Sequence, residues 1–329
     1  MWISLQAWRL PTALLGLFLS FAHVAQGQKT TLGQIDAALQ AGEADRALAL
    51  IGSLPDGGAQ NAEARNLACR VHFTLQQWDA AITECQQAVQ LDGGNSNYHL
   101  WLGRALGEKA DRASFLTAFE LAKQVRAEFE EAVRLNPRNG PALSDLGSFY
   151  QAAPGVIGGG LDKAEAVAGR LNKIDPARAH QLRGEIAEQR KDYTGAEEEY
   201  KNAIAASSHP AFQWTVLGSL YERRQEWPEM EPAIGNCVTA AARDNTAGVA
   251  LYDGAGVLIK ARRDSELAAR MLENYLSGTS KTEEAPAFIA HYRLARLKLQ
   301  LGDVAGAKRE QGAAFALAQE YHPAQELKF

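Results

Sequence analysis

The sequence predicts an all-α solenoid built from about eight antiparallel helix pairs, and the family resemblance described below implies a right-handed superhelix. After residue 28, apolar residues recur at spacings of three and four, and Ala, Leu, Glu and Arg dominate, as in amphipathic helices. No stretch alternates polar and β-branched residues in the manner of a strand. Similar helix pairs follow one another at a period near 34 residues, and a fixed period of this length indicates a repeat array.

The period is clearest in residues 62–95 and 177–210. Each segment has a helix, a short polar turn and an aromatic residue, Trp78 or Tyr193. An alanine follows three residues later, and another alanine follows after seven more. Residues seven apart share one face of a helix, so this small pair allows a second helix to approach closely.

This pattern resembles the tetratricopeptide repeat (TPR), and the resemblance covers essentially the whole chain after residue 27. The family pattern places the repeats at 28–61, 62–95, 96–139, 140–176, 177–210, 211–244, 245–287 and 288–321. Residues 322–329 are expected to form a short tail. Tyr252 stands where the seventh repeat should have a small residue, so the register of that repeat is left open.

The first 27 residues are expected to be a secretory signal peptide. They hold one basic residue, Arg9, and no acid, followed by an apolar run at 13–21 and the small residues of Ala25-Gln26-Gly27. The run is shorter than the roughly 20 residues that span a bilayer; an uncleaved anchor is the alternative. Cleavage changes the net charge from −5 to −6. We therefore expect an exported protein, periplasmic or secreted, that does not span a membrane after cleavage.

Composition and motifs argue against several activities. The chain has 34 basic and 39 acidic residues, and without a basic excess nucleic-acid binding is not expected. The seven histidines form no HExxH pair and no zinc spacing with cysteine, and the chain has no GxSxG elbow. The glycine run near residue 158 lacks the ending of a phosphate-binding loop. We expect no catalytic residues, no metal and no cofactor.

Two of the three cysteines, Cys69 and Cys85, lie on opposite sides of a turn centred on Gln77. An antiparallel helix pair would bring them face to face. They are expected to be either a disulfide, which an exported protein allows, or two small buried thiols. A disulfide closing a loop of about fifteen residues would contribute about 3 kcal/mol. Cys237 is expected in the core.

Two insertions interrupt the period in neighbouring repeats. The third repeat is ten residues too long within 108–126, where the absence of glycine and proline predicts about 15 Å of extra helix. The fourth repeat carries a Pro- and Gly-rich loop at 153–160. The apolar residues of the two insertions are expected either to pack on each other or to form an exposed apolar ledge for a partner. They are Phe115, Leu116, Phe119, Val156 and Ile157.

In the family that the chain resembles, the first helix of each repeat lines a concave groove. The inward positions would be Asn66, Arg70, Phe73, Leu100, Arg104, Ser144, Ser148, Gln151, Gln181, Glu185, Glu188, Thr215, Ser219, Glu222, Arg223, Tyr292 and Arg296. Such a mixed polar lining suits an extended peptide. The lysines of the carboxylate clamp found in some family members are missing, so that clamp is not predicted.

The sequence therefore predicts a non-enzymatic, exported scaffold or adaptor that binds a peptide or protein partner in the groove. Two alternatives stay open. One is a fixed structural subunit of a cell-envelope or secretion assembly, and the other is an accessory protein that serves a separate enzyme.

Overall fold

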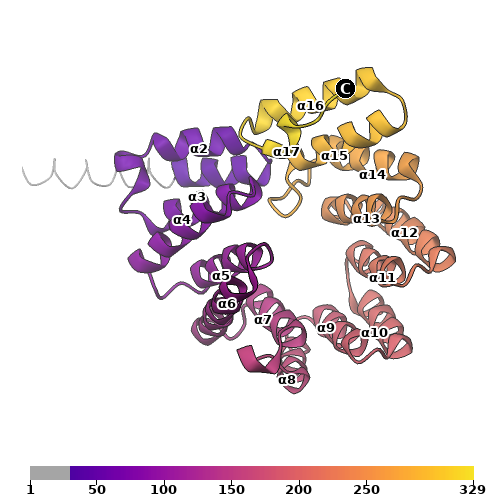
Figure 1. Ribbon diagram of the computed structural model, residues 1–329, viewed down its shortest axis with the longest axis horizontal. Helices are drawn as coiled ribbons and strands as arrows, with labels where there is room; N and C mark the ends of the chain where they lie inside the picture. Colours follow the sequence, from indigo (N-terminus) through magenta and orange to yellow (C-terminus); the bar gives the residue numbers. More distant parts are fainter. Residues whose placement is uncertain (1–29) are drawn as a thin grey trace, which may run out of the picture.

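The computed structural model describes residues 30–329, so the signal peptide predicted at 1–27 lies outside the described residues. The described part is built from α-helices with short 3-10 turns (Figure 1). After the helical residues 30–40, the elements are α2 (Ala44–Gly52), η1 (Pro55–Gly58), α3 (Ala62–Thr74), α4 (Trp78–Leu91), α5 (Ser96–Ala110), α6 (Phe115–Leu135), α7 (Gly140–Ala152), η2 (Gly155–Ile157), α8 (Leu161–Leu171), α9 (Pro176–Gln189), α10 (Tyr193–Ala206), α11 (Ala211–Arg224), α12 (Trp227–Ala241), α13 (Gly248–Ala261), α14 (Ser265–Ser277), α15 (Ala287–Gln300), α16 (Val304–Leu317) and α17 (His322–Gln325).

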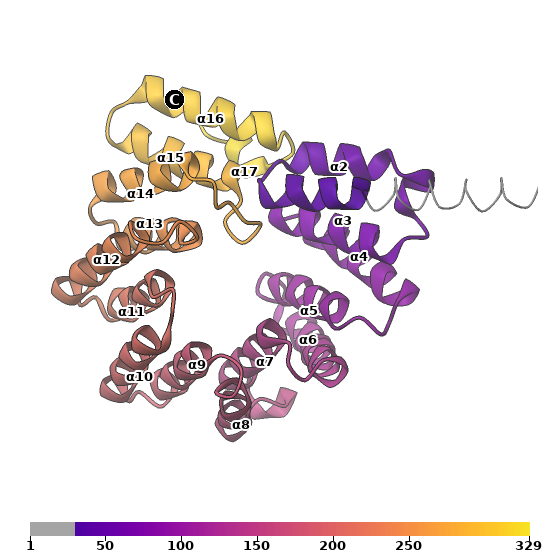
Figure 2. The same cartoon turned by 180° about the vertical axis from the view of Figure 1, so that it is seen from behind.

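Consecutive helices pack as pairs, which we number as repeats 1 to 8. Residues 30–40 with α2 form repeat 1, and the pairs α3–α4 through α15–α16 form repeats 2 to 8. The first helix of each pair lies toward the inside of the curved array and the second lies toward the outside (Figures 1 and 2). The fold is thus an all-α solenoid.

Small residues set the close packing within each pair. The alanines that define the period, such as Ala81 and Ala196, are fully buried. Five first helices also carry a glycine against which a large side chain of a neighbouring helix packs. At Gly184, an added Cβ would lie 2.4 Å from the Tyr200 ring, so even alanine would not fit. The equivalent glycines are Gly103, Gly147, Gly218 and Gly254.

Side-chain caps and left-handed turns fix where the helices begin and end. Asn61 and Asp175 each accept the backbone N–H three residues later, which satisfies a free donor in the first turn of α3 and α9. Gln76 and Gln225 adopt positive φ values of 61° and 58° in the turns after α3 and α11. This left-handed residue ends the first helix and turns the chain back along it.

The insertion in repeat 3 lengthens one helix. α6 spans 21 residues, whereas α4 spans 14. The turn before it falls at 111–114. The loop inserted in repeat 4 contains η2, and Arg126 of α6 donates to the carbonyl oxygen of Ile157 at 3.1 Å. The two insertions are therefore neighbours.

The array curves until its two ends meet, so it forms a closed ring instead of an open superhelix. α2 lies beside α16 and α17 in both views (Figures 1 and 2). The backbone N–H of Gln319 donates to Asp45 at 3.0 Å, and Gln77 donates to Glu320 at 3.0 Å. Gly42, with a φ of 75°, sits so close to α15 that an added Cβ would lie 2.5 Å from the nitrogen of Ala287.

The predicted tail is part of this junction. Residues 322–325 form the short helix α17, in which Ala324 is fully buried. Tyr321, just before it, packs against the ring of Phe288 with the ring centroids 5.1 Å apart. The last repeat is thus covered by its own C-terminal residues and by repeat 1. No helix in residues 30–329 has the length and apolar character needed to cross a bilayer.

Candidate functional site

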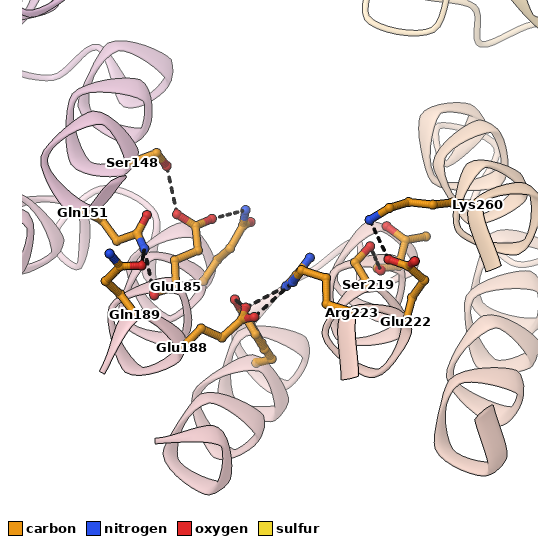
Figure 3. Close-up of polar contacts among 12 residues, drawn as sticks. Ser148, Gln151, Glu185, Glu188, Gln189, Ser219, Glu222, Arg223 and Lys260 are labelled. Atoms are coloured by element: carbon orange, nitrogen blue, oxygen red, sulfur yellow. Dashed lines mark hydrogen bonds and ion pairs between the residues drawn. The ribbon is translucent and has the colours of Figure 1, made fainter. Parts of the chain in front are cut away.

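The inner face of the ring carries a series of polar contacts, each joining the first helices of two neighbouring repeats. Figure 3 shows part of this series, from Ser148 to Lys260. Each contact joins groups about one repeat apart in sequence. They are Asp36–Arg70 (3.0 Å), Arg104–Asp145 (2.6 Å), Ser148–Glu185 (2.9 Å), Glu188–Arg223 (2.6 Å) and Glu222–Lys260 (2.7 Å).

Aromatic rings join two further pairs of repeats. Trp101 of repeat 3 lies 5.6 Å from the Arg70 guanidinium and 4.8 Å from that of Arg104. Tyr252 of repeat 7 lies 4.0 Å from the guanidinium of Arg293 in repeat 8. A cation over an aromatic face contributes about 0.5–1 kcal/mol at an exposed site. These contacts extend the series from repeat 2 to repeat 3 and from repeat 7 to repeat 8.

The linker between α14 and α15, residues 278–286, connects the two ends of this series. It projects from repeat 7 toward the middle of the ring (Figures 1 and 2). Glu283 accepts two hydrogen bonds from Arg70, at 2.6 and 2.8 Å. Gln40 of repeat 1 forms two longer hydrogen bonds with Glu283, one as donor and one as acceptor. The pair is largely buried, with side-chain exposures of 16% for Arg70 and 10% for Glu283.

A cavity of about 700 Å³, which we call the polar cavity, opens on the inner face between repeats 4 and 7. It is bounded by α7, by the N-terminal ends of α9, α11 and α13, and by Glu284 of the linker. A second cavity of about 600 Å³ adjoins it and shares Gln181 and Glu185. Glu185 therefore lies where the two cavities meet.

Glu185 is held by hydrogen bonds from uncharged groups. Ser148 Oγ donates to one carboxylate oxygen at 2.9 Å, and Gln181 Nε2 donates to the other at 3.2 Å. Burial raises the pKa of this carboxyl group, because desolvation disfavours the charged form.

Two side chains of the polar cavity have a buried polar atom that finds no hydrogen-bond partner among the described residues. These atoms are Ser144 Oγ on α7 and Gln213 Oε1 on α11. Gln213 is only 6% exposed. Buried polar groups in folded proteins are nearly always paired, so these two unpaired atoms set the walls of this cavity apart.

A third cavity, the aromatic cavity, lies on the other side of the linker and has a volume of about 730 Å³. Phe73, Trp78, Trp101 and Phe129 contribute rings to its wall. Phe73 packs edge-on against both tryptophans, with centroids 5.3 and 5.4 Å apart. Glu283 of the linker lines this cavity and also accepts hydrogen bonds from Arg70.

These features decide the type of repeat. Helix pairs recur near a 34-residue period, small residues lie at their contacts, and first helices form the inner layer. In fold, the chain is a tetratricopeptide-repeat solenoid. No protein-family model and no curated protein sequence matches it.

Three solved TPR structures are similar to the solenoid. The thermophilic TPR protein TTC0263 of Thermus thermophilus is 18% identical, over 58% of this chain and 97% of that one, with a TM-score of 0.49. MamA is 21% identical over 55% and 86% of the two chains, with a TM-score of 0.37. YrrB, described as having an unusual peptide-binding site, is 15% identical over 60% and 95%, with a TM-score of 0.36. The fold assignment rests on the helix pairs of this chain alone.

Most of the predicted groove positions face the interior of the TPR ring. Residues that line its cavities or bind the linker are Arg70, Phe73, Arg104, Ser144, Ser148, Gln151, Gln181, Glu185, Glu188, Ser219, Glu222 and Arg223. Many of them are already hydrogen-bonded to another repeat. The groove is therefore an ordered polar surface, and much of its hydrogen-bonding capacity is used within the ring.

Three predicted groove positions are wrong, because they are buried between helices. Asn66, Leu100 and Thr215 are only 5%, 3% and 2% exposed. Each lies one turn before a residue that does face the ring interior. One turn earlier along each first helix, the neighbouring repeat covers the side chain. The methyl group of Thr215, for example, packs against Gly254 of α13.

The positions predicted in repeat 8 line none of the three cavities. Tyr292 packs against Tyr321, with ring centroids 5.7 Å apart, and Arg296 extends over Tyr292. Arg293, one residue later than Tyr292, lines the aromatic cavity instead. A shift of one residue turns a side chain by about 100° around the helix axis, which is enough to move it from one face to another.

Sequence reasoning missed the partners of the groove residues. They are Asp36, Trp101, Asp145, Tyr252, Lys260, Glu283 and Arg293. Residues of opposite charge on first helices, 34 to 41 positions apart, are a readable signal for most of the ion pairs. Glu283 and Arg70 lie 213 residues apart, and no repeat spacing points to their contact.

The two insertions leave part of the predicted apolar ledge exposed. Phe115, Leu116 and Val156 are 83%, 78% and 77% exposed, so mutual packing does not cover them. Ile157 is buried, at 8% exposure, and Phe119 lies under the ammonium group of Lys123. The exposed apolar groups are therefore one pair at the start of α6 and a separate valine in the loop.

The cysteines of repeat 2 are bonded to each other. Cys69 and Cys85 form a disulfide between α3 and α4, with their Cα atoms 5.1 Å apart. Cys237 is a free thiol in the core, and burial raises its pKa to about 12.

Four histidines pair with carboxylates, and no motif in the sequence connects these groups. His99 and Glu128 are 2.6 Å apart, and the hydrogen bond to Glu128 raises the pKa of the imidazole. His180–Glu199 and His291–Glu310 repeat this pairing between the two helices of a repeat, and His209–Asp244 joins two repeats. In residues 30–329 no three His, Cys, Asp or Glu side chains converge as a metal site would require.

Proposed function

We propose that the protein is a non-enzymatic scaffold that holds an extended polypeptide segment of a partner on the inner face of its ring. The polar cavity carries this proposal. Four successive first helices supply its donors and acceptors, which matches the spaced N–H and C=O groups of an extended chain. The partly exposed carboxylate of Glu185 offers an acceptor for such a chain.

The closed shape supports this function. Contacts between the two ends fix the curvature, so the inner face does not have to be ordered when a partner binds. A preorganised site loses less entropy on binding than a flexible one. We also propose export of the protein to the periplasm or cell exterior, and the disulfide in repeat 2 favours an oxidising compartment.

A fixed structural subunit of a cell-envelope or secretion assembly is the second candidate. The exposed Phe115 and Leu116 at the start of the long α6 favour it, since they offer an apolar contact outside the ring. In that case the inner face would serve the ring's own stability. The two candidates differ in the surface that touches the partner.

Site-specific photo-cross-linking tests the choice. Phe212 lines the polar cavity and is 38% exposed, so a photoreactive phenylalanine analogue fits there with little change. The same analogue at Phe115 reports on the outer contact, and at the exposed Lys201 it gives the background. Polypeptide adducts at position 212 above those at 201 support the proposal. Adducts at 115 but not at 212 favour the assembly subunit, and equal yields at 212 and 201 argue against inner-face binding.

A further inference from the structure

Glu185 is a largely buried carboxylate without a cationic hydrogen-bond partner among the described residues. Its carboxylate oxygens accept from Ser148 and Gln181, which carry no charge, and Gln151 donates to its backbone carbonyl oxygen. Arg223 is close enough to act on its charge, but that guanidinium donates two hydrogen bonds to Glu188, at 2.6 and 3.0 Å. Burying a charge costs free energy unless it is paired, so a cation that reached this carboxylate would stabilise its charged form.

Two other carboxylates of the inner face have cationic partners. Asp145 pairs with Arg104 at 2.6 Å, and Glu222 pairs with Lys260 at 2.7 Å. Within residues 30–329, Glu185 thus stands out from the series of inter-repeat contacts, because its contact to repeat 4 comes from a serine.

The walls of the polar cavity carry an excess of negative charge. The acidic side chains are Asp145, Asp175, Glu185, Asp244 and Glu284. The basic ones are Arg178 and His209, and both are already engaged. Arg178 binds Asp175 at 3.1 Å, and His209 binds Asp244 at 2.8 Å. A cavity with this balance attracts a cation and repels an anion.

Two side chains of the same cavity also hold acceptor atoms without a partner in the described chain, and each of these atoms is covered by its neighbours. Gln213 is only 6% exposed, and its carbonyl oxygen Oε1 has no partner within residues 30–329. Ser144 Oγ, also unpaired there, is able to accept as well. A lysine ammonium has three donors and an arginine guanidinium has five, and neither has an acceptor. The partly exposed carboxylate of Glu185, in a cavity with an excess of acidic side chains, therefore fits a basic side chain.

We propose that the polar cavity binds a lysine or arginine side chain of the partner segment, with Glu185 as its counter-ion. This inference rests on the proposed function, since it specifies the chemistry of the segment that the ring holds. It also predicts that acidic segments are excluded from this cavity.

Selection from a randomised library of displayed 12-residue peptides, with the purified protein immobilised, tests the inference. The bound pool is sequenced, and one recovered peptide is synthesised with an acetylated N-terminus, both with lysine and with acetyl-lysine at the enriched position. Its affinity is measured for the wild type, for Glu185→Gln and for the matched control Glu198→Gln. Glu198 lies on the exposed surface of α10, and its substitution changes the net charge by the same amount.

We expect enrichment of lysine and arginine and depletion of acidic residues. Glu185→Gln should weaken binding about 10- to 100-fold, the range for losing a hydrogen bond to a charged group. Acetylation of the lysine should have a similar effect on the wild type and little effect on Glu185→Gln, whereas Glu198→Gln should bind as the wild type does. Because acetylation changes only the peptide, it tests the pairing without altering the fold of the protein.

Two results would overturn the inference in distinguishable ways. Peptides that bind without an excess of basic residues, or that bind Glu185→Gln and Glu198→Gln equally well, refute the cation site and leave peptide binding standing. If no peptide is enriched over an uncoated surface, peptide binding by the ring itself is refuted.

Discussion

Replacing Glu283 with glutamine should open the ring. The change removes the charge that faces Arg70 at the junction between the two chain ends. Removing one partner of a buried ion pair costs about 3–5 kcal/mol, because the remaining charge stays buried. Arg70 keeps its contact with Asp36 and is 16% exposed, so we expect a smaller loss of about 2–3 kcal/mol in the free energy of unfolding.

A double-mutant cycle isolates this contact. The variants are Glu283→Gln, Arg70→Gln and the combination, and their unfolding free energies are measured with urea. The matched control is the pair Glu231 and Arg263, which has the same chemistry and a distance of 3.0 Å but side-chain exposures near half. Exposed pairs typically couple by less than about 1 kcal/mol. We expect a coupling of about 2 kcal/mol for Arg70–Glu283 and about 0.5 kcal/mol or less for the control.

Small-angle X-ray scattering measures the shape of the same variants. An opened array is longer than a ring, so the largest interatomic distance should increase in Glu283→Gln and stay unchanged in the control variants. The reasoning would be refuted by wild-type scattering together with a coupling no larger than that of the exposed pair. In that case the backbone contacts at the junction would hold the ring without this ion pair.

Three further predictions concern other parts of the ring. Gly42→Ala should lower the free energy of unfolding by about 2 kcal/mol or more, because it forces a side chain into a left-handed turn and against α15. Gly312→Ala, in open space on α16, should instead raise it by up to about 1 kcal/mol. Thermal unfolding of both variants checks this pair of predictions. The hydrogen bond to Glu128 raises the pKa of His99 in the folded protein, so the protonated imidazole stabilises the fold. This contribution is fully present below the unfolded-state pKa of about 6.5 and is lost as the pH rises through the folded-state pKa. His99→Gln should therefore lose more stability at pH 5.5 than at pH 8.5, and an equal loss at both would contradict it. Replacing Cys69 and Cys85 with alanine should lower the unfolding free energy by about 3 kcal/mol, and a reductant should destabilise the wild type but not this variant.

The solenoid could be predicted from the sequence because its determinants are local and recur. Alanines such as Ala81 and Ala88 must be small in every helix pair, so the period is visible without any knowledge of distant contacts. The same locality explains why α6 could be predicted to be long, since its extra residues contain no helix breaker.

Closure of the ring could not be predicted in this way. It depends on small rotations that accumulate over eight repeats, and an error at any one of them would displace the ends. Glu283 lies in a linker of low repeat similarity, where no pattern indicates its contact with Arg70. The misplacement of Tyr292 has a related cause, because a register error of one residue at a repeat boundary changes the face on which a side chain lies.

Contact between the first and last repeats has a consequence for how this protein can change over evolutionary time. An open solenoid gains or loses a whole repeat and simply becomes longer or shorter, since each unit touches only its neighbours. Here such an event would separate Gly42 from α15 and Arg70 from its carboxylate. Duplication or deletion of a unit would then be destabilising, and the number of units should stay fixed.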